Sequence, residues 1–147
     1  MLEKIVCMSN VERRYKKRPE MLALYKQTET SATCPFCEPN ITNDFVARTN
    51  FWNVVLQMFP CKGSKAHLLL LPKRHIADVA QLSPEEFLDL QNAISLAGNG
   101  QHSLEDGYGL ALRVKELGGI TIRHLHFHLI VPKEVKTIKS AVNFGIG

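Results

Sequence analysis

Three of the six histidines stand at alternate positions in the segment His124-Leu-His126-Phe-His128. In a β-strand successive side chains point to opposite faces, so this spacing places the three imidazoles on one face and the apolar residues between them on the other. An imidazole that titrates near neutral pH can act as nucleophile, proton donor or metal ligand. Neighbours on one strand face are ~7 Å apart, too far for three ligands of one ion but suited to groups that flank a phosphate. The pattern therefore favours phosphoryl chemistry over a three-histidine metal site.

A second group of candidate residues is the pair Cys34 and Cys37, which has the Cys-x-x-Cys spacing of half a zinc site. Spacing alone leaves three interpretations open: a metal pair, a redox pair or an accident. A thioredoxin-like redox pair should open a helix after a strand in a βαβ pattern, and no such pattern surrounds these cysteines. Zinc would need two further ligands, for which histidine is the obvious source.

The elements that must position these residues form an α+β pattern. Ser83, Pro84 and Glu86 have the types expected of an N-cap, a first helical position and a capping box, so a helix should run from there to about Gly98. Its buried stripe is expected to comprise Phe87, Leu88, Leu90, Ile94 and Leu96. Apolar or β-branched runs bounded by turn residues predict an antiparallel sheet of about five strands, at residues 45–48, 52–59, 67–72, 108–114 and 120–132.

The whole chain of 147 residues is expected to form one domain. We divide it into an N-terminal helical segment (1–33), a core (34–132) and a C-terminal strand or tail (133–147). No apolar run approaches the ~18 residues that span a bilayer, and the N-terminus lacks the apolar core of a signal peptide. We therefore expect a cytoplasmic protein with reduced thiols and with neither a membrane nor a nucleic-acid partner.

Residues 124–130 resemble, at every position, the His-φ-His-φ-His-φ-φ signature of the histidine-triad (HIT) superfamily, in which φ is hydrophobic. The resemblance implies a HIT-like fold and a homodimer. It also implies a nucleotide hydrolase that cleaves dinucleoside polyphosphates or nucleoside phosphoramidates through a covalent nucleotidyl-histidine intermediate. The similarity covers about residues 34–132 and includes Phe59-Pro60, the segment 67–75 ending in Pro-Lys-Arg-His, the helix start at 82–86 and the glycine-containing turn at 118–121.

The resemblance also implies a role for individual residues. His126 matches the nucleophile that takes the nucleotidyl group, and His128 matches the histidine that contacts phosphate oxygens and assists the leaving group. His67 corresponds to an earlier histidine beside the same phosphate. Thr121 stands where the family has a hydroxyl that hydrogen-bonds a phosphate oxygen, and Gln57 lies near the position of a residue that binds the ribose hydroxyls.

Zinc-binding members of the superfamily use this cysteine pair together with the histidine of the Pro-Lys-Arg-His segment and the first histidine of the triad. The resemblance therefore implies a zinc site made of Cys34, Cys37, His75 and His124. Four protein ligands close the coordination shell, so this zinc would be structural. The chain departs from the family at Arg113, in a stretch where many members carry asparagine. Arg113 could neutralise a pyrophosphate, or it could be a solvated strand residue.

Two other functions stay open at this stage. One is nucleotidyl transfer to phosphate or to a sugar phosphate, as in a nucleotidyltransferase or phosphorylase. The other is nucleotide binding by a catalytically weak, zinc-stabilised protein, which the altered residues around the triad would permit. The complete triad argues against the second, because binding alone does not require it.

Overall fold

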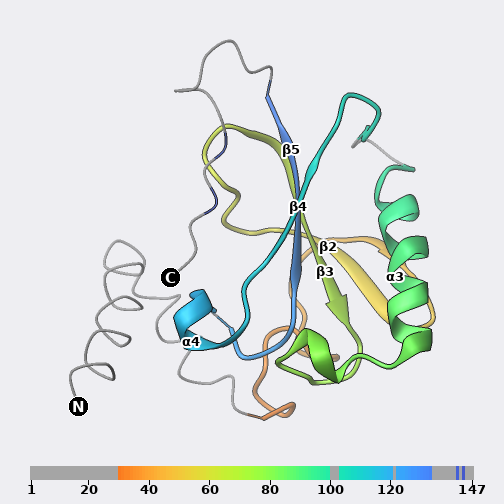
Figure 1. Cartoon of the computed structure of the whole chain (residues 1–147), viewed down its shortest axis with the longest axis vertical. Helices are drawn as coiled ribbons and strands as arrows, with labels where there is room; N and C mark the ends of the chain where they lie inside the picture. Colours follow the sequence, from red (N-terminus) through yellow and green to blue (C-terminus); the bar gives the residue numbers. More distant parts are fainter. Residues whose placement is uncertain (1–29, 100–102, 121, 134–141, 143, 145–147) are drawn as a thin grey trace.

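The computed structural model describes residues 30–99, 103–120, 122–133, 142 and 144. Five strands in this part of the chain form one antiparallel sheet in the order β1-β2-β3-β5-β4 (Figure 1). The predicted α+β fold is thereby confirmed. The proposed N-terminal helical segment and most of the proposed C-terminal tail lie outside the described residues. The strands are β1 (Phe45–Arg48), β2 (Trp52–Leu56), β3 (Ser64–Pro72), β4 (Gly109–Leu112) and β5 (Phe127–Pro132).

Strand β3 lies at the centre of the sheet, and its leucine run is buried without alternation. Leu68 and Leu70 belong to the core on the helix side of the sheet. Leu69 and Leu71 pack on the opposite face, in a second apolar cluster that includes Phe36. A strand covered on both faces can be apolar at every position, and this explains why the run shows no polar residue.

Helix α3 (Pro84–Ala97) begins at the predicted residue and ends before Gly98. The Ser83 hydroxyl accepts the amide of Glu86 at 3.2 Å, and the Glu86 carboxylate accepts the amide of Ser83 at 2.8 Å. These reciprocal bonds form the expected capping box, with Pro84 at the start of the first turn. The helix lies along one face of the sheet (Figure 1) and contacts β1, β2 and β3.

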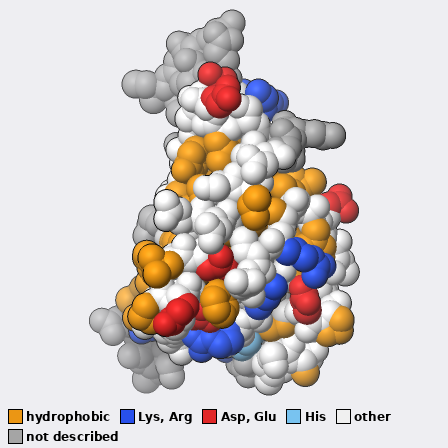
Figure 2. All heavy atoms as spheres, turned by 90° about the vertical axis from the view of Figure 1, so that its right-hand side faces the viewer, with side chains coloured by type: hydrophobic (Ala, Val, Ile, Leu, Met, Phe, Trp, Pro, Cys, Tyr) orange, Lys and Arg blue, Asp and Glu red, His pale blue; other side chains and the backbone are white. Residues whose placement is uncertain are grey.

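The buried face of α3 differs from the expected one. Phe87, Leu88 and Leu96 are 56%, 71% and 38% exposed, so placing them in the buried stripe was wrong. On the side of the molecule that carries α3, hydrophobic atoms reach the surface between charged side chains (Figure 2). The side chains of α3 that are buried are Glu86, Asp89, Leu90, Ala93 and Ala97.

Polar contacts with the β1–β2 connection explain this rotation of the helix. The Asp89 carboxylate accepts the Thr49 hydroxyl at 2.6 Å and the Phe51 amide at 2.9 Å. The indole N–H of Trp52 donates to the carbonyl of Glu86 at 2.8 Å. Because a buried polar group is stable only when it is hydrogen-bonded, these bonds fix which side of α3 faces the sheet. The apolar pattern of the helix alone does not reveal them.

Two shorter helical segments, η1 (Val79–Gln81) and α4 (Lys115–Gly118), lie in the connections after β3 and β4. Across the described ranges, no helix combines the length and the apolar character that a membrane crossing requires. The last strand was expected from residue 120 but begins at Phe127. Just before it, the amide of Leu125 bonds to the carbonyl of Ile76 at 2.6 Å, in a connecting loop rather than in a neighbouring strand.

Candidate active site and metal site

The three histidines of the triad are buried on the sheet face opposite α3. His124 is 0%, His126 3% and His128 4% exposed. The apolar residues between them, Leu125 and Phe127, belong to the core on the helix side. The alternation expected from the sequence therefore holds, although only the last histidine lies within the regular part of β5.

The ring of His126 is held by the backbone just before it. Its Nδ1 atom lies 2.7 Å from the carbonyl oxygen of His124. Because a carbonyl oxygen can only accept, the proton of His126 sits on Nδ1, and Nε2 keeps its lone pair. Burial lowers the pKa of His126 to about 4, so the ring is neutral at physiological pH. A neutral imidazole with a bare Nε2 is the form that can act as a nucleophile.

His128 has the opposite tautomer, which a chain of hydrogen bonds determines. The amide of Cys61 donates to Nδ1 of His67 at 2.9 Å, so the proton of a neutral His67 is on Nε2. That Nε2 lies 2.8 Å from Nδ1 of His128 and donates to it. The proton of His128 is therefore on Nε2, an atom that is buried and has no hydrogen-bond partner among the described residues.

Burial is also the largest cause of the lowered pKa values of His67 and His128. It lowers the pKa of His67 to about 4 and holds the pKa of His128 far below its ordinary value. Both rings are therefore neutral at physiological pH. The centroids of the His126 and His128 rings are 5.0 Å apart. The site thus presents a nitrogen lone pair and an N–H donor side by side, which suits attack on a phosphorus atom and a hydrogen bond to one of its oxygens.

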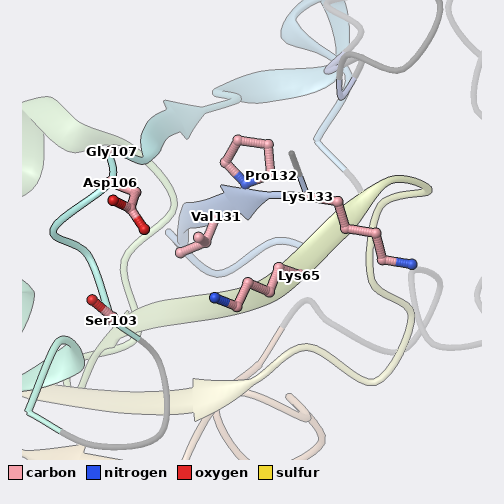
Figure 3. Close-up of a pocket in the computed structure, with 7 residues that line it drawn as sticks. All are labelled: Lys65, Ser103, Asp106, Gly107, Val131, Pro132 and Lys133. Carbon is pink, nitrogen blue, oxygen red and sulfur yellow. The ribbon is translucent and has the colours of Figure 1, made fainter. Parts of the chain in front are cut away.

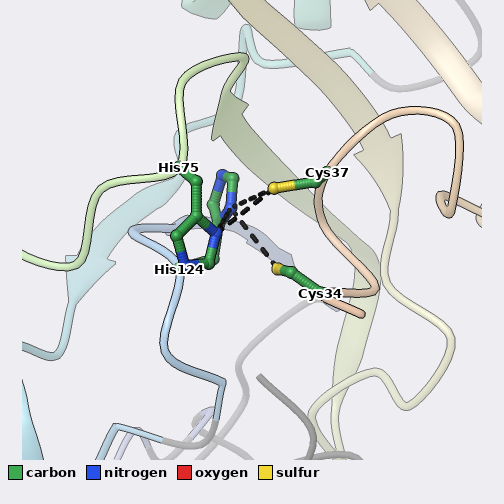
Figure 4. Close-up of side chains that lie close together, drawn as sticks. All are labelled: Cys34, Cys37, His75 and His124. Carbon is green, nitrogen blue, oxygen red and sulfur yellow. Dashed lines mark hydrogen bonds between the residues drawn. The ribbon is translucent and has the colours of Figure 1, made fainter. Parts of the chain in front are cut away.

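Four side chains next to the triad could hold a metal ion (Figure 4). The ligand atoms of Cys34, Cys37, His75 and His124 all lie within 4.8 Å of one another. The Cys37 sulfur is 3.2 Å from Nδ1 of His75 and 3.4 Å from Nδ1 of His124, and these two nitrogens are 3.3 Å apart. Tetrahedral zinc with its usual bond lengths places such ligands about 3.3–3.8 Å apart. The described side chains therefore fit a tetrahedral ion with two sulfur and two nitrogen ligands.

The surroundings of this cluster also favour a metal over a redox role. His124 directs Nε2 to the carbonyl oxygen of Pro72 at 2.8 Å, which leaves Nδ1 as the ligand atom. Burial raises the pKa of the Cys34 thiol and raises that of Cys37 to about 12. Reactive redox cysteines have a lowered pKa instead, and a bound cation is what would stabilise two buried thiolates here.

Phe36, which stands between the two cysteines, connects the metal cluster to the triad. Its ring centroid is 6.1 Å from that of His124 and 5.2 Å from that of His126, both in edge-on arrangements. The side chain is 6% exposed. Phe36 could not be identified as a site residue from the sequence, because one aromatic residue in a loop has no pattern that would distinguish it.

The substrate-binding residues inferred from the resemblance are placed only in part. His67 lies against His128, on the histidine face of the sheet. Gln57 follows β2 directly opposite His67, since its amide donates to the His67 carbonyl at 2.9 Å, and its side-chain oxygen accepts the Phe59 amide at 3.4 Å. Thr121 lies outside the described residues.

One further side chain stands beside His128, and a second contacts that side chain. The ring of Phe144 is 4.8 Å from that of His128, centroid to centroid. The guanidinium carbon of Arg113 lies 3.6 Å from the centroid of the Phe144 ring. A separate pocket near the end of β5 contains none of the predicted site residues (Figure 3). It is lined by Lys65, Ser103, Asp106, Gly107, Val131, Pro132 and Lys133.

Comparison with known proteins agrees with this geometry. The family model for the HIT domain matches residues 38–135, which is more than half of the chain. An uncharacterised HIT-like protein from Chlamydia trachomatis is 32% identical over 80 residues, covering 52% of this chain and 69% of that protein. A bis(5'-adenosyl)-triphosphatase from Dictyostelium discoideum is 33% identical over 70 residues, covering 46% of this chain. The match spans 47% of that enzyme, so the chain covers about half of its length.

Solved structures show the same fold. A hypothetical protein from Leishmania major has a TM-score of 0.62 at 26% identity, over 80% of this chain and 82% of that one. A HIT family hydrolase from Legionella pneumophila has a TM-score of 0.52 at 27% identity, over 69% and 90% of the two chains. A Zn-bound histidine triad family protein from Mycobacterium smegmatis, at 22% identity and a TM-score of 0.57 over 74% and 81%, is similar in fold.

Proposed function

The chain belongs to the HIT domain family, and we propose that it is a nucleotide hydrolase that works through a covalent nucleotidyl intermediate on His126. The substrates we propose are dinucleoside polyphosphates or nucleoside phosphoramidates. Similarity to a bis(5'-adenosyl)-triphosphatase and to a HIT family hydrolase supports hydrolysis. The observation that carries the proposal is the pair of opposite tautomers, a bare Nε2 on His126 beside an N–H on Nε2 of His128.

In the first step, Nε2 of His126 attacks the α-phosphorus and forms a P–N bond. The bond from phosphorus to the leaving group breaks, and the leaving group departs with the electron pair, a phosphate chain as an anion and an amine with a proton taken from water. The proton stays on Nδ1 of His126, where it is donated in a hydrogen bond to the carbonyl of His124, so the modified ring carries a positive charge. His128 donates a hydrogen bond from Nε2 to a phosphate oxygen, and His67 keeps it in that tautomer.

In the second step, water attacks the same phosphorus, and the P–N bond breaks with its electron pair returning to Nε2. The water contributes its oxygen to the nucleoside monophosphate, and its proton is released to solvent. The cationic ring is a good leaving group, so one difficult displacement is divided into two easier ones.

The test is transient-state kinetics with diadenosine triphosphate. In wild type, intact-mass analysis of samples stopped without acid should show an adduct of one adenylyl group that forms and decays, and peptide mapping should place it on His126. His126→Ala should show no adduct and should lose about 10⁴-fold or more in turnover. His128→Ala should still form the adduct, with turnover lowered by about 10²–10³-fold, because it loses one hydrogen-bond donor to the phosphate.

Other outcomes would replace this proposal. Full turnover in His126→Ala would remove the covalent mechanism. A wild type that turns over only when phosphate or a sugar phosphate is added, with the nucleotidyl group found on the acceptor, would make the protein a transferase. A wild type that binds nucleotides but cleaves none would favour the nucleotide-binding protein.

We also propose that Cys34, Cys37, His75 and His124 hold one structural zinc ion per chain. The support is the donor set and its spacing, together with the hydrogen bond that directs Nε2 of His124 away from the cluster. Four protein ligands leave no open position for substrate, so zinc would supply rigidity rather than chemistry. Elemental analysis of protein purified without added metal should find about one zinc per chain, and a folded, metal-free protein would contradict the proposal.

A further inference from the structure

Arg113 and Phe144 form a cation–aromatic pair next to His128 that the triad chemistry described above does not use. The Arg113 guanidinium lies over the Phe144 ring, with its carbon 3.6 Å from the ring centroid, and the Phe144 ring meets the ring of His128 in an edge-on contact with 4.8 Å between the centroids. A cation on an aromatic face is attracted by the electrons of the ring, so Phe144 fixes the position of the charge. A positive charge is thus held one ring away from the histidine that contacts the phosphate.

The register of the sheet places Arg113 on the histidine face. In the pairing of β4 with β5, Ala111 is opposite His128 and Leu112 is opposite Phe127. The paired positions end there, and Arg113 follows directly, two residues after Ala111, so continued alternation along the strand would place it on the same face as Ala111 and His128. Electrostatics agree with this placement, because the charge of Arg113 is one of the causes, after burial, that lower the pKa of His67 and of His128.

The hydrogen-bond chain limits what His128 can give to a leaving group. Its Nδ1 accepts from His67, so it carries a single proton, on Nε2. Transfer of that proton would leave an imidazolate, which is far too basic to form here. His128 can therefore donate a hydrogen bond but is a poor source of a proton. An amine leaving a phosphoramidate must be protonated as it departs. A phosphate chain leaves as an anion, needs no proton and is stabilised by a nearby cation.

Taking the proposed function as the premise, we infer that Arg113 selects an anionic leaving group. The substrate class is then the nucleoside polyphosphates rather than the phosphoramidates. Arg113 would contact the departing phosphate chain while the P–O bond breaks and the P–N bond to His126 forms. Phe144 is a positioning residue, because it acts on the leaving group only through Arg113.

The inference is tested by comparing two substrates that differ only in the leaving group, diadenosine triphosphate and an adenosine phosphoramidate of a primary amine. Arg113→Gln should lower kcat/KM for the triphosphate by about 100-fold, mainly through kcat, and for the phosphoramidate by less than about threefold. Arg113→Lys should recover a large part of the loss, because it restores the charge. Lys65→Gln removes an exposed lysine on β3, outside the proposed site, and should change neither substrate.

The role of Phe144 is tested by the selectivity between the two substrates, which a merely structural role would not change. Phe144→Leu should lower kcat/KM for the triphosphate by about tenfold and leave the phosphoramidate unchanged, whereas Phe144→Tyr, which keeps the aromatic face, should retain wild-type selectivity.

The possible failures of the inference and of the proposed function are distinct. Equal losses on both substrates in Arg113→Gln, or no loss on either, would overturn the inference. If wild type still formed the adduct on His126, the proposed function would stand. A wild type that cleaved neither substrate would overturn both.

Discussion

At the scale of single residues, His67 controls His128 through one hydrogen bond. Its Nδ1 accepts the amide of Cys61, and its Nε2 donates to Nδ1 of His128. A backbone amide therefore determines the tautomer of two rings in succession. The neighbouring His126 receives the opposite tautomer because its Nδ1 faces a carbonyl oxygen. Identical side chains thus acquire different tautomers from the backbone groups around them, one with an N–H donor on Nε2 and one with the bare Nε2 that the proposed nucleophile requires.

The series of hydrogen bonds from Cys61 through His67 to His128 predicts a difference between two substitutions of His67. His67→Leu removes the donor to Nδ1 of His128, so that ring can change tautomer, and kcat/KM for diadenosine triphosphate should fall by about 10- to 100-fold. His67→Gln can still donate from its amide nitrogen and should stay within about tenfold of wild type. Steady-state kinetics would measure both variants, and thermal unfolding would verify that both are folded. Equal losses would mean that His67 does not act through this bond.

The candidate residues that sequence could identify are those whose type is rare and whose spacing is distinctive. His124, His126 and His128 alternate along one segment, and Cys34 and Cys37 have metal-ligand spacing. The residues that sequence could not identify are equally close to the site. A backbone amide such as that of Cys61 is present at almost every position, and single aromatic residues such as Phe36 and Phe144 follow no periodicity. Their contribution depends on contacts between distant segments.

At the scale of elements, the ends of α3 were predictable and its rotation was not. The capping box is a local pattern at Ser83–Glu86, so the sequence alone predicts the start of the helix. The buried face depends on where Asp89 meets Thr49 and Phe51, which are 40 and 38 residues away in the chain. The start of β5 differs from the predicted one for a similar reason. The amide of Leu125 bonds to Ile76 in a distant loop, and β5 begins after this bond, at Phe127.

The start of α3 predicts a pH-dependent contribution to stability. The Glu86 carboxylate accepts both Nε and Nη2 of Arg74, at 2.7 and 2.8 Å, and this hydrogen bonding lowers the pKa of Glu86 from 4.5 to about 2. Between these values the unfolded chain binds a proton that the folded chain does not. The stabilisation is therefore complete above pH 4.5 and is lost as the pH falls to about 2.

Glu86→Gln should accordingly destabilise the protein by about 1–2 kcal/mol near neutral pH, and the difference from wild type should shrink with acidification. Urea unfolding at several pH values would measure it. Glu85→Gln removes an exposed carboxylate from the same turn and should change stability by less than about 0.5 kcal/mol. A constant difference between wild type and Glu86→Gln at every pH would contradict the assignment.

The metal cluster joins three connections of the chain, so its loss should affect stability more than chemistry. Cys34→Ala should abolish zinc retention and lower the free energy of unfolding by at least about 2 kcal/mol, while kcat of the folded fraction changes by less than about tenfold. Cys61→Ala is the matched control, because Cys61 lies outside the four-residue cluster and the substitution keeps the backbone amide that donates to His67. A chelator should lower Tm in wild type and in this control but not in Cys34→Ala.

At the scale of the whole molecule, the sheet has two edges that differ in character. The strand order places β1 and β4 at the edges. β1 ends in Arg48, whose guanidinium pairs with Glu38 at 3.1 Å and lies 3.8 Å from the centroid of the Phe45 ring. β4 has the sequence Gly-Leu-Ala-Leu and carries no charge. Charged residues on an edge strand oppose pairing with another chain, so β1 is protected in a way that β4 is not.

The face of β4 on the helix side is also incompletely covered. Leu110 is paired with Leu129, which belongs to the core beneath α3, yet Leu110 is 43% exposed. The reason is that α3 contacts β1, β2 and β3 but does not extend to β4. A second copy of the chain that paired through β4 would satisfy the open backbone groups of this edge and cover Leu110 at once.

We therefore predict a homodimer joined through β4, with a mass in solution of twice the 16.6 kDa of the chain. Size-exclusion chromatography with light scattering would measure it. Leu110→Lys places a charge in the proposed interface and should give a folded monomer, whereas Phe45→Lys places the same charge on the β1 edge and should leave the dimer intact. A monomeric wild type would refute the prediction. A dimer that persists in Leu110→Lys and dissociates in Phe45→Lys would place the interface at β1 instead. The contacts of Arg48 with Glu38 and with the Phe45 ring would then have to break on dimerisation.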